Sequence, residues 1–464
     1  MKNANMINTQ LLVIIFFLIH RGLIAQLPSV NLESVEFWQP QNKTTHWIQL
    51  KVDGTNGTNI SDGIKTKAWK LNSDGSVIRK PVCYVSGCQA RVSASFSLDG
   101  SNNSCIGPDG LPQNGCDFFA RATVQGLDES GNIAFATNLP PKKLVLSGNK
   151  KHLEYPATSI EDEFTLNKIH YFPMFTINWE WAYDLDGAWT DAGTSDNPLY
   201  ITKEVPKKEE PSKGYYHYLT VVHIGCKYGD KMNTYEDLVE NIKNYFSLRQ
   251  VTNINGEPLK YYGQWTGGSL GSNTRDLLLY KDGICWAWVK FFIDVLKSQG
   301  FQELNNLVTV AGSQIGTSPG FFVKTWIDSP PGISGNPDFP YINVKGSPFY
   351  LNNSYNWDYE EVTLITPASA QNNSNPQSDF GSHGIVRVLG TFYDPSYGLF
   401  YGAPVFLPPP YNLIETVPGL DANISAYYIT DMMDPNIYFI IMNNSLDYPY
   451  IHVKLPFLDE DDDW

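Results

Sequence analysis

Short stretches of alternating hydrophobic and polar residues dominate the first third of the chain. Residues 47–52, 91–96 and 118–124 alternate in this way, and Asp-Gly pairs such as Asp53-Gly54 separate the stretches. A period of two is typical of strands with one buried face, and Asp-Gly is a common turn sequence. The pattern predicts a β-sandwich of immunoglobulin or fibronectin type over residues 27–150.

The same character continues over residues 151–229. Residues 175–181 alternate cleanly, and residues 218–224 do so less strictly. We therefore expect a β-rich segment that leads into the next domain.

Helical spacing begins near residue 234. Leu238, Ile242 and Phe246 are spaced four apart after Thr234, which predicts a helix over 234–247. A second run with apolar residues at helical spacing predicts a helix over 283–299, because Gly300 is a typical stop. Strand-like stretches return at residues 307–311, 321–327, 384–389, 391–393 and 437–442. Residues 230–464 are thus expected to form an α+β catalytic domain with a C-terminal β extension and an acidic tail.

Cys285 is the candidate nucleophile of this domain. It stands at the start of the second predicted helix, directly after Asp282-Gly283-Ile284. The positive end of the helix dipole favours the thiolate, which is the nucleophilic form of cysteine.

A predicted hairpin supplies the groups that a thiolate nucleophile requires. His383 begins its first strand and Asp394 ends its second, with the turn expected at Leu389-Gly390. Strand parity then places His383 and Asp394 on the same face of the hairpin. The spacing predicts a Cys285-His383-Asp394 triad, in which histidine is the base and aspartate orients it.

Several segments around these residues resemble transglutaminase-like proteins. The residues that carry the resemblance are Thr274 to Leu278, Asp282 to Trp288, Phe292 to Leu296, Gly300-Phe301, and His383 to Ser396. Two departures from that pattern are the interval of 11 residues between His383 and Asp394 and the bulky Trp286. The resemblance implies a papain-like α+β core, thiol acyl chemistry, and an upstream Trp or Gln side chain as oxyanion donor. Trp265 and Gln264 are the candidates for that donor.

Two Gly-x-Ser-x-Gly sequences, centred on Ser269 and Ser318, offer a serine nucleophile as an alternative. A serine hydrolase elbow requires a strand before the motif and a helix directly after it, and neither site has both. The sequence contains no His-Glu-x-x-His or similar cluster, so we expect neither a metal nor another cofactor.

Four of the six cysteines lie within 34 residues of one another. These residues are Cys83, Cys88, Cys105 and Cys116. In an exported protein such clustering predicts two disulfides, although three pairings are open. Zinc is the competing interpretation, and the spacing is loose for it.

The amino-terminal residues predict export. Residues 11–19 are all apolar and Ala25 follows, which is typical of a signal peptide over residues 1–26; a buried element is the alternative. The net charge of −15 argues against nucleic acid as a partner, and the chain has no second apolar stretch long enough to cross a membrane.

The sequence therefore predicts a secreted thiol enzyme that acts on amide bonds of a protein or peptide, by acyl transfer or by hydrolysis. The alternative is a non-catalytic extracellular or cell-surface binding protein that keeps the same fold. The sequence does not indicate the oligomeric state.

Overall fold

A computed structural model of the chain describes most of the first 300 residues and shorter segments beyond them. The described residues are 29–55, 59–60, 63–99, 117–146, 152–207, 216–262, 271–302, 307–312, 321–322, 370–374, 379–380, 382–389, 391–400, 413–415, 424–429, 438–443 and 451–454. The expected signal peptide at residues 1–26 lies outside them.

The chain divides into two compact units, and both are discontinuous in sequence. Unit 1 comprises Met1–Trp47, Ser61–Leu166 and Tyr171–Leu199. Unit 2 comprises Ile48–Ile60, Asn167–His170 and Tyr200–Trp464.

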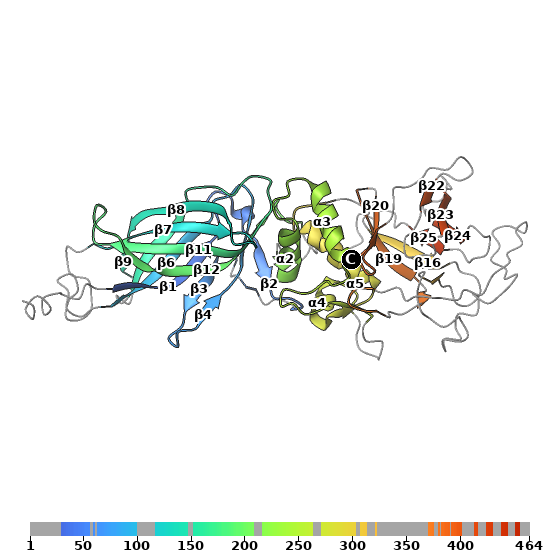
Figure 1. Ribbon diagram of the computed structural model, residues 1–464, viewed down its shortest axis with the longest axis horizontal. Helices are drawn as coiled ribbons and strands as arrows, with labels where there is room; N and C mark the ends of the chain where they lie inside the picture. The colour runs from blue at the N-terminus through green and yellow to red at the C-terminus, as the bar shows by residue number, and fades with distance from the viewer. Residues whose placement is uncertain are drawn as a thin grey trace, which may run out of the picture. The chain divides into compact units, whose positions relative to one another are not determined.

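Unit 1 is built on two sheets (Figure 1). The six-stranded sheet has the order β4-β3-β1-β6-β10-β9, with β4 at Val77–Arg79, β3 at Lys65–Leu71, β1 at Ser29–Trp38, β6 at Arg91–Asp99, β10 at His152–Ser159 and β9 at Val145–Leu146. The five-stranded sheet has the order β5-β12-β11-β7-β8, with β5 at Val82–Val85, β12 at Thr190–Thr202, β11 at His170–Ala182, β7 at Phe119–Leu127 and β8 at Ile133–Lys143. A short 3₁₀ helix, η1, occupies Thr44–His46.

Aromatic side chains join the two sheets of unit 1. Trp179 of β11 makes edge-to-face contacts with Phe96 of β6 and Tyr155 of β10, at centroid distances of 5.5 and 5.1 Å. Phe37 of β1 meets Phe175 of β11 in the same geometry at 6.0 Å. These five side chains are fully buried, so the alternating apolar positions of both sheets face one another in a common core.

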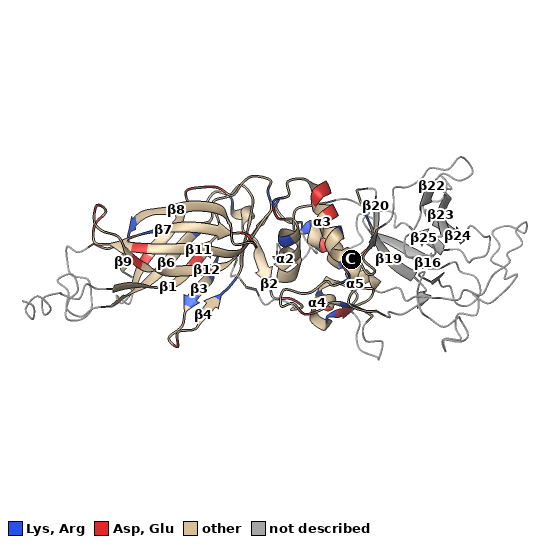
Figure 2. Cartoon of the chain, viewed as in Figure 1, with Lys and Arg blue, Asp and Glu red and all other residues tan. Residues whose placement is uncertain are grey.

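Charged side chains of unit 1 pair across its strands. Lys65 lies 2.9 Å from Glu36, and Arg121 lies 2.7 Å from Glu180. Figure 2 shows both signs of charge on these strands. Because the pairs are partly exposed, each contributes little to stability, and burial of the aromatic core remains the main source.

Unit 2 contains the α-helices of the described residues. They are α2 at Leu219–Tyr228, α3 at Tyr235–Ser247, α4 at Thr274–Tyr280 and α5 at Cys285–Lys297. Two short parallel pairs accompany them, β2 at Gln49–Lys51 with β13 at Tyr216–Tyr218, and β14 at Lys260–Tyr261 with β15 at Asp282–Gly283. No helix in the described part of the chain is long and apolar enough to cross a membrane.

Both predicted helices are present. The Thr234 side chain accepts the N–H of Asp237 at 3.1 Å and so caps α3. The predicted helix over 283–299 begins at Cys285 itself, after the two residues of β15.

Helix α2 corrects the prediction of a strand at residues 218–224. The run is rich in β-branched residues, which favour strands. A distant carboxylate overrides this preference: Asp53 accepts the backbone N–H of Thr220 at 3.0 Å and its hydroxyl at 2.5 Å. The first turn of a helix is thereby capped by a residue 167 positions earlier, and tertiary contact decides the local structure.

The C-terminal part of unit 2 forms an eight-stranded sheet of order β21-β20-β19-β16-β25-β24-β23-β22. Its strands are β16 at Leu307–Gly312, β19 at Ser382–Val388, β20 at Thr391–Asp394, β21 at Leu399–Phe400, β22 at Leu413–Glu415, β23 at Ile424–Ile429, β24 at Tyr438–Asn443 and β25 at Ile451–Lys454. A separate pair joins β17 at Phe321–Phe322 to β18 at Asp379–Phe380.

The predicted α+β core of papain or transglutaminase type is wrong. Strands predominate, and the structure has several sheets with few helices. The four described helices span only 7 to 13 residues each. The apolar stretches after residue 307 instead pair with one another into the eight-stranded sheet, because their β-branched and aromatic side chains suit a pleated surface.

Candidate functional site

Cys285 is the first residue of α5 and is 3% exposed. Ile284 before it is extended, and its N–H donates to the carbonyl of Gly271 at 3.0 Å. The carbonyl of Ile284 accepts the N–H of Ala287 at 3.0 Å, so Ile284 is the N-cap and the helix begins directly at Cys285. The thiol therefore lies at the positive end of the helix, as predicted.

Position 283, directly before this helix, has no room for a side chain, so glycine is required there. A Cβ at position 283 would lie 2.9 Å from Cβ of Ala287 and 3.0 Å from Cδ1 of Leu277. Real Cβ atoms essentially never approach within 3.0 Å of a neighbour. A side chain here would push α4 and α5 apart and move Cys285.

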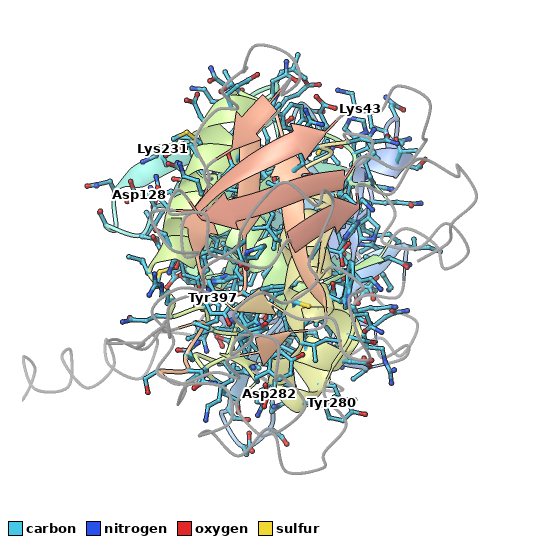
Figure 3. All side chains as sticks on the ribbon, turned by 90° about the vertical axis from the view of Figure 1, so that its right-hand side faces the viewer. Lys43, Asp128, Lys231, Tyr280, Asp282 and Tyr397 are labelled. Atoms are coloured by element: carbon cyan, nitrogen blue, oxygen red, sulfur yellow. The ribbon has the colours of Figure 1, made fainter. Side chains whose placement is uncertain are left out.

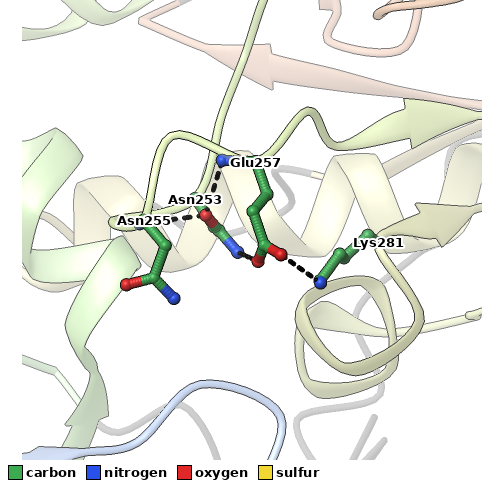
Figure 4. A network of polar contacts seen from close by, with 4 residues as sticks. All are labelled: Asn253, Asn255, Glu257 and Lys281. Carbon is green, nitrogen blue, oxygen red and sulfur yellow. Dashed lines mark hydrogen bonds and ion pairs between the residues drawn. The ribbon is translucent and has the colours of Figure 1, made fainter.

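A polar network holds the chain that leads to this turn (Figure 4). Lys281, in the left-handed conformation that ends α4, donates to Glu257, and Asn253 donates to the same carboxylate at 2.7 Å. The hydrogen bond from Lys281, followed by that from Asn253, lowers the pKa of Glu257. The network therefore ties residues 253–257 to the residue four positions before the thiol.

Tyr261 and Tyr397 form a buried pair close to Cys285. Their rings lie 5.2 Å apart at 70°, and both side chains are fully buried. Tyr261 pairs with Gly283 between β14 and β15, which brings it within two residues of the thiol. Tyr397 is fully buried, whereas Tyr280, at the lower edge of the view in Figure 3, is half exposed.

Burial raises the pKa of both phenols well above the ordinary value. The proximity of Tyr397, Cys285 and Asp394 adds to this effect at Tyr261. At Tyr397 the proximity of Asp394 and Cys285 adds to it, while a hydrogen bond with Tyr261 acts in the opposite direction. The thiol and the carboxylate thus act on the same two phenols. Both tyrosines stay protonated at neutral pH and remain hydrogen-bond donors.

Asp394 ends β20 and is 3% exposed. One carboxylate oxygen, Oδ1, accepts the backbone N–H of Ser396 at 3.1 Å and that of Tyr397 at 3.3 Å. These bonds form a turn that fixes the carboxylate and places Tyr397 three residues beyond it. The structure therefore brings two predicted site residues, Cys285 and Asp394, to the same tyrosine pair.

The predicted hairpin between β19 and β20 is present. Val388 pairs with Thr391, so the turn lies between these two residues, and Leu389 within it has a φ of +50°. The pairing of Val386 with Tyr393 puts position 385 opposite 394 when it is extended by one pair. Positions 383 and 394 then belong to the same row of the hairpin, as strand parity predicted.

The other row of the hairpin packs against α5. A Cβ at Gly384 would lie 3.2 Å from Trp286 and 3.3 Å from Val289. Tyr393 stacks on Phe292 at 5.8 Å. The structure describes the backbone of His383 but not its side chain, so its part in a triad stays a prediction.

Cys83 and Cys88 are both buried, and no disulfide joins cysteines among the described residues. Burial raises the pKa of Cys88 to about 12. Cys83 lies within β5, where all four residues are buried in the core of unit 1. Cys105 and Cys116 lie outside the described residues, so the two disulfides stay a prediction.

Four further sequence candidates also fall outside the described residues. They are Gln264, Trp265, Ser269 and Ser318. Within the described ranges, no group of three or more His, Cys, Asp or Glu side chains could hold a metal ion.

Sequence reasoning missed Tyr261 and Tyr397. The chain contains 27 tyrosines, and neither residue belongs to a motif with a chemical meaning of its own. The signal for Tyr397 was its position three residues after Asp394, and that for Tyr261 lies only in the pairing of two short strands.

No family model and no curated protein matches this chain.

Proposed function

We propose that the protein is a thiol-dependent enzyme that acts on amide bonds of a protein or peptide, with Cys285 as nucleophile. The observation that carries the proposal is the shared surroundings of Cys285 and Asp394. The thiol at a helix N-terminus and a fixed carboxylate act on the same pair of buried, protonated tyrosines. Neighbouring nucleophiles, acids and donors of this kind are typical of catalytic sites.

The proposed reaction proceeds through an acyl-enzyme. His383 takes the thiol proton as Cys285 Sγ attacks the amide carbonyl, and the same proton passes to the leaving amine as the C–N bond breaks. Water or a second amine then attacks the thioester, which releases the acyl group and restores the thiol. Asp394 orients the imidazole, and the backbone N–H of Cys285 is one donor to the oxyanion.

The turn at Asp394 suits an orienting role. Two backbone N–H groups fix Oδ1, and a carboxylate offers further acceptor positions to an imidazole. His383 enters the proposal from the sequence alone, because its row of the hairpin is opposite to the row that packs against α5. Export of the enzyme is proposed from the sequence of residues 1–26.

A non-catalytic binding protein is the second candidate. The observation that favours it is the 3% exposure of Cys285, which is typical of a cysteine that packs as a small apolar residue. In that case the thiol does not react while the protein is folded.

Alkylation of the folded, full-length protein distinguishes the two functions. Iodoacetamide near pH 7 should modify Cys285, whereas Cys88 and Cys226, whose pKa values burial raises to about 12, should stay unmodified. Peptide mapping by mass spectrometry reports each cysteine separately. Labelling should vanish in Cys285→Ser and persist in Ser269→Ala and Ser318→Ala.

The role of Asp394 is tested by Asp394→Asn. Asparagine keeps the oxygen that accepts the N–H groups of Ser396 and Tyr397, so the turn is retained while the charge is lost. Labelling of Cys285 at pH 7 should slow by about tenfold. A folded wild-type protein whose Cys285 does not react would exclude the enzyme and favour the binding protein.

A further inference from the structure

Gln371 is a fully buried polar residue next to the candidate site. Its side-chain amide donates to the carbonyls of Phe246, at 2.7 Å, and Pro395, at 2.9 Å. Its side-chain oxygen accepts the N–H of Val251 at 3.4 Å. Replacing a buried glutamine with this many partners lowers stability, because each partner would lose its hydrogen bond while staying buried.

The backbone of Gln371 connects the two segments that carry the tyrosines. Its N–H donates to the carbonyl of Ser396 at 2.9 Å, and its carbonyl accepts the N–H of Tyr261 at 3.0 Å. With the side-chain bond to Pro395, one residue holds both the turn after Asp394 and the strand of Tyr261.

Asn373 adds a second connection. Its side-chain amide donates to the carbonyls of Tyr261, at 2.7 Å, and Tyr262, at 3.0 Å. Residues 371–373 therefore bind the backbone on both sides of the tyrosine pair, and they do so from a part of the chain that belongs to neither segment.

We infer that Gln371 is a positioning residue for the proposed reaction: it holds Tyr261 and the Asp394–Tyr397 turn against the N-terminus of α5. The inference rests on the proposed function, since it makes the hydrogen bonds of Gln371 responsible for the geometry around the nucleophile Cys285. Gln371 acts through the backbone of its neighbours and does not touch the thiol. Supporting contacts of this kind fix catalytic groups to within a fraction of an ångström.

Gln299 provides a matched control in the same unit. It is also a fully buried glutamine, and its side chain bonds to Cys226 Sγ at 3.4 Å, Ser298 Oγ at 3.1 Å and Lys203 N at 3.3 Å. None of these groups belongs to the candidate site. Leucine at either position removes the side-chain hydrogen bonds, leaves the backbone ones and keeps most of the volume, so both variants lose stability for the same reason.

The experiment compares Gln371→Leu and Gln299→Leu in the full-length protein. The rate of Cys285 alkylation by iodoacetamide is measured from pH 5 to pH 9, together with hydrogen exchange in peptides that contain Tyr261 and Tyr397. In Gln371→Leu we expect alkylation at pH 7 to slow by about ten- to a hundredfold, with its pH profile displaced, and exchange to rise in both peptides. In Gln299→Leu both readouts should match the wild type.

Equal effects of the two substitutions would overturn the inference, because Gln371 would then act only on stability. Should Gln371→Leu fail to fold, Asn373→Ala removes the bonds to Tyr261 and Tyr262 at a partly exposed position, and it should slow alkylation in the same direction; unchanged alkylation in this variant would also overturn the inference. A wild-type Cys285 that never reacts, with exchange still raised in Gln371→Leu, would instead refute the proposed function and leave Gln371 a structural contact.

Discussion

Gly384 of β19 approaches Trp286 of α5 so closely that a Cβ at position 384 would lie 3.2 Å from the indole ring. The hairpin that carries His383 and Asp394 thus packs on the first turn of the helix that carries Cys285. The absence of a side chain at Gly384 sets the distance between these two elements.

Gly384→Val should therefore destabilise the protein. The added methyl groups must displace Trp286 or Val289, and overpacking of this kind costs about 1–3 kcal/mol. Gly384→Ala, which adds a single methyl, should cost less. Urea unfolding of the two variants measures the difference, and equal stability of Gly384→Val and wild type would show that β19 can move away from α5 freely.

Asp53 should contribute to stability through α2. Asp53→Ala removes the acceptor of the Thr220 N–H and hydroxyl, and loss of a helix cap costs about 1–2 kcal/mol. Glu240→Ala, which removes an exposed ion pair with Lys243 on α3, is the control and should change stability by less than about 0.5 kcal/mol. The free energy of unfolding is measured for both, and equal values would argue that Asp53 does not cap α2.

The stability of unit 2 should fall with acid through His223. Burial, aided by the charge of Lys227, lowers the pKa of His223 from 6.5 to about 4. As pH falls below 6.5, His223 becomes protonated in the unfolded chain but stays neutral in the folded protein. The contribution of His223 to the free energy of unfolding is therefore fully present above pH 6.5 and is lost between 6.5 and about 4. The loss is at most about 3 kcal/mol.

His223→Gln tests this assignment. Glutamine does not titrate, and it can keep a hydrogen bond to Tyr200, whose hydroxyl lies 3.1 Å from Nδ1 of His223. The difference in unfolding free energy between pH 7.5 and pH 4.5 should be smaller in the variant than in the wild type. The same difference in both proteins would mean that His223 stays accessible to protons in the fold.

Asn372 should remain without a glycan although it begins an Asn-x-Ser sequence. Its side-chain nitrogen donates to the carbonyls of Val251, at 2.7 Å, and Leu259, at 2.8 Å, so the amide that would carry the glycan is occupied in the fold. Asn42, which begins the sequence Asn42-Lys43-Thr44, is exposed and serves as the comparison. After expression in a glycosylating host, glycopeptide mapping should find Asn42 modified and Asn372 bare; a glycan on Asn372 would contradict the described contacts.

Local patterns in the sequence predicted the elements that carry the candidate site. The Thr234 cap, the helix that starts at Cys285 and the hairpin around Leu389 all depend on residues within a few positions of one another. Periodicity, capping and turn formation act over that range, so the sequence contains the information.

The failures share a different cause. Helix α2 depends on Asp53, and the surroundings of Cys285 depend on Tyr261 and Gln371, which are distant in sequence. The predicted fold class was wrong for the same reason. The C-terminal stretches were interpreted as a minor extension, whereas in the structure they pair into one large sheet. Pairings over long separations leave little periodic signal in a single chain.

The capping of α2 by Asp53 has a consequence for how the protein is made. A ribosome releases Ile48–Ile60 more than 150 residues before Thr220, and the backbone returns to unit 2 only after most of unit 1 has been synthesised. Unit 2 therefore cannot fold completely in the order in which the chain is synthesised, because Ile48–Ile60 can pack only after α2 has been made. For the same reason, a fragment that begins at Tyr200 would lack β2 and Asp53, so no single cut of the chain separates the two units intact.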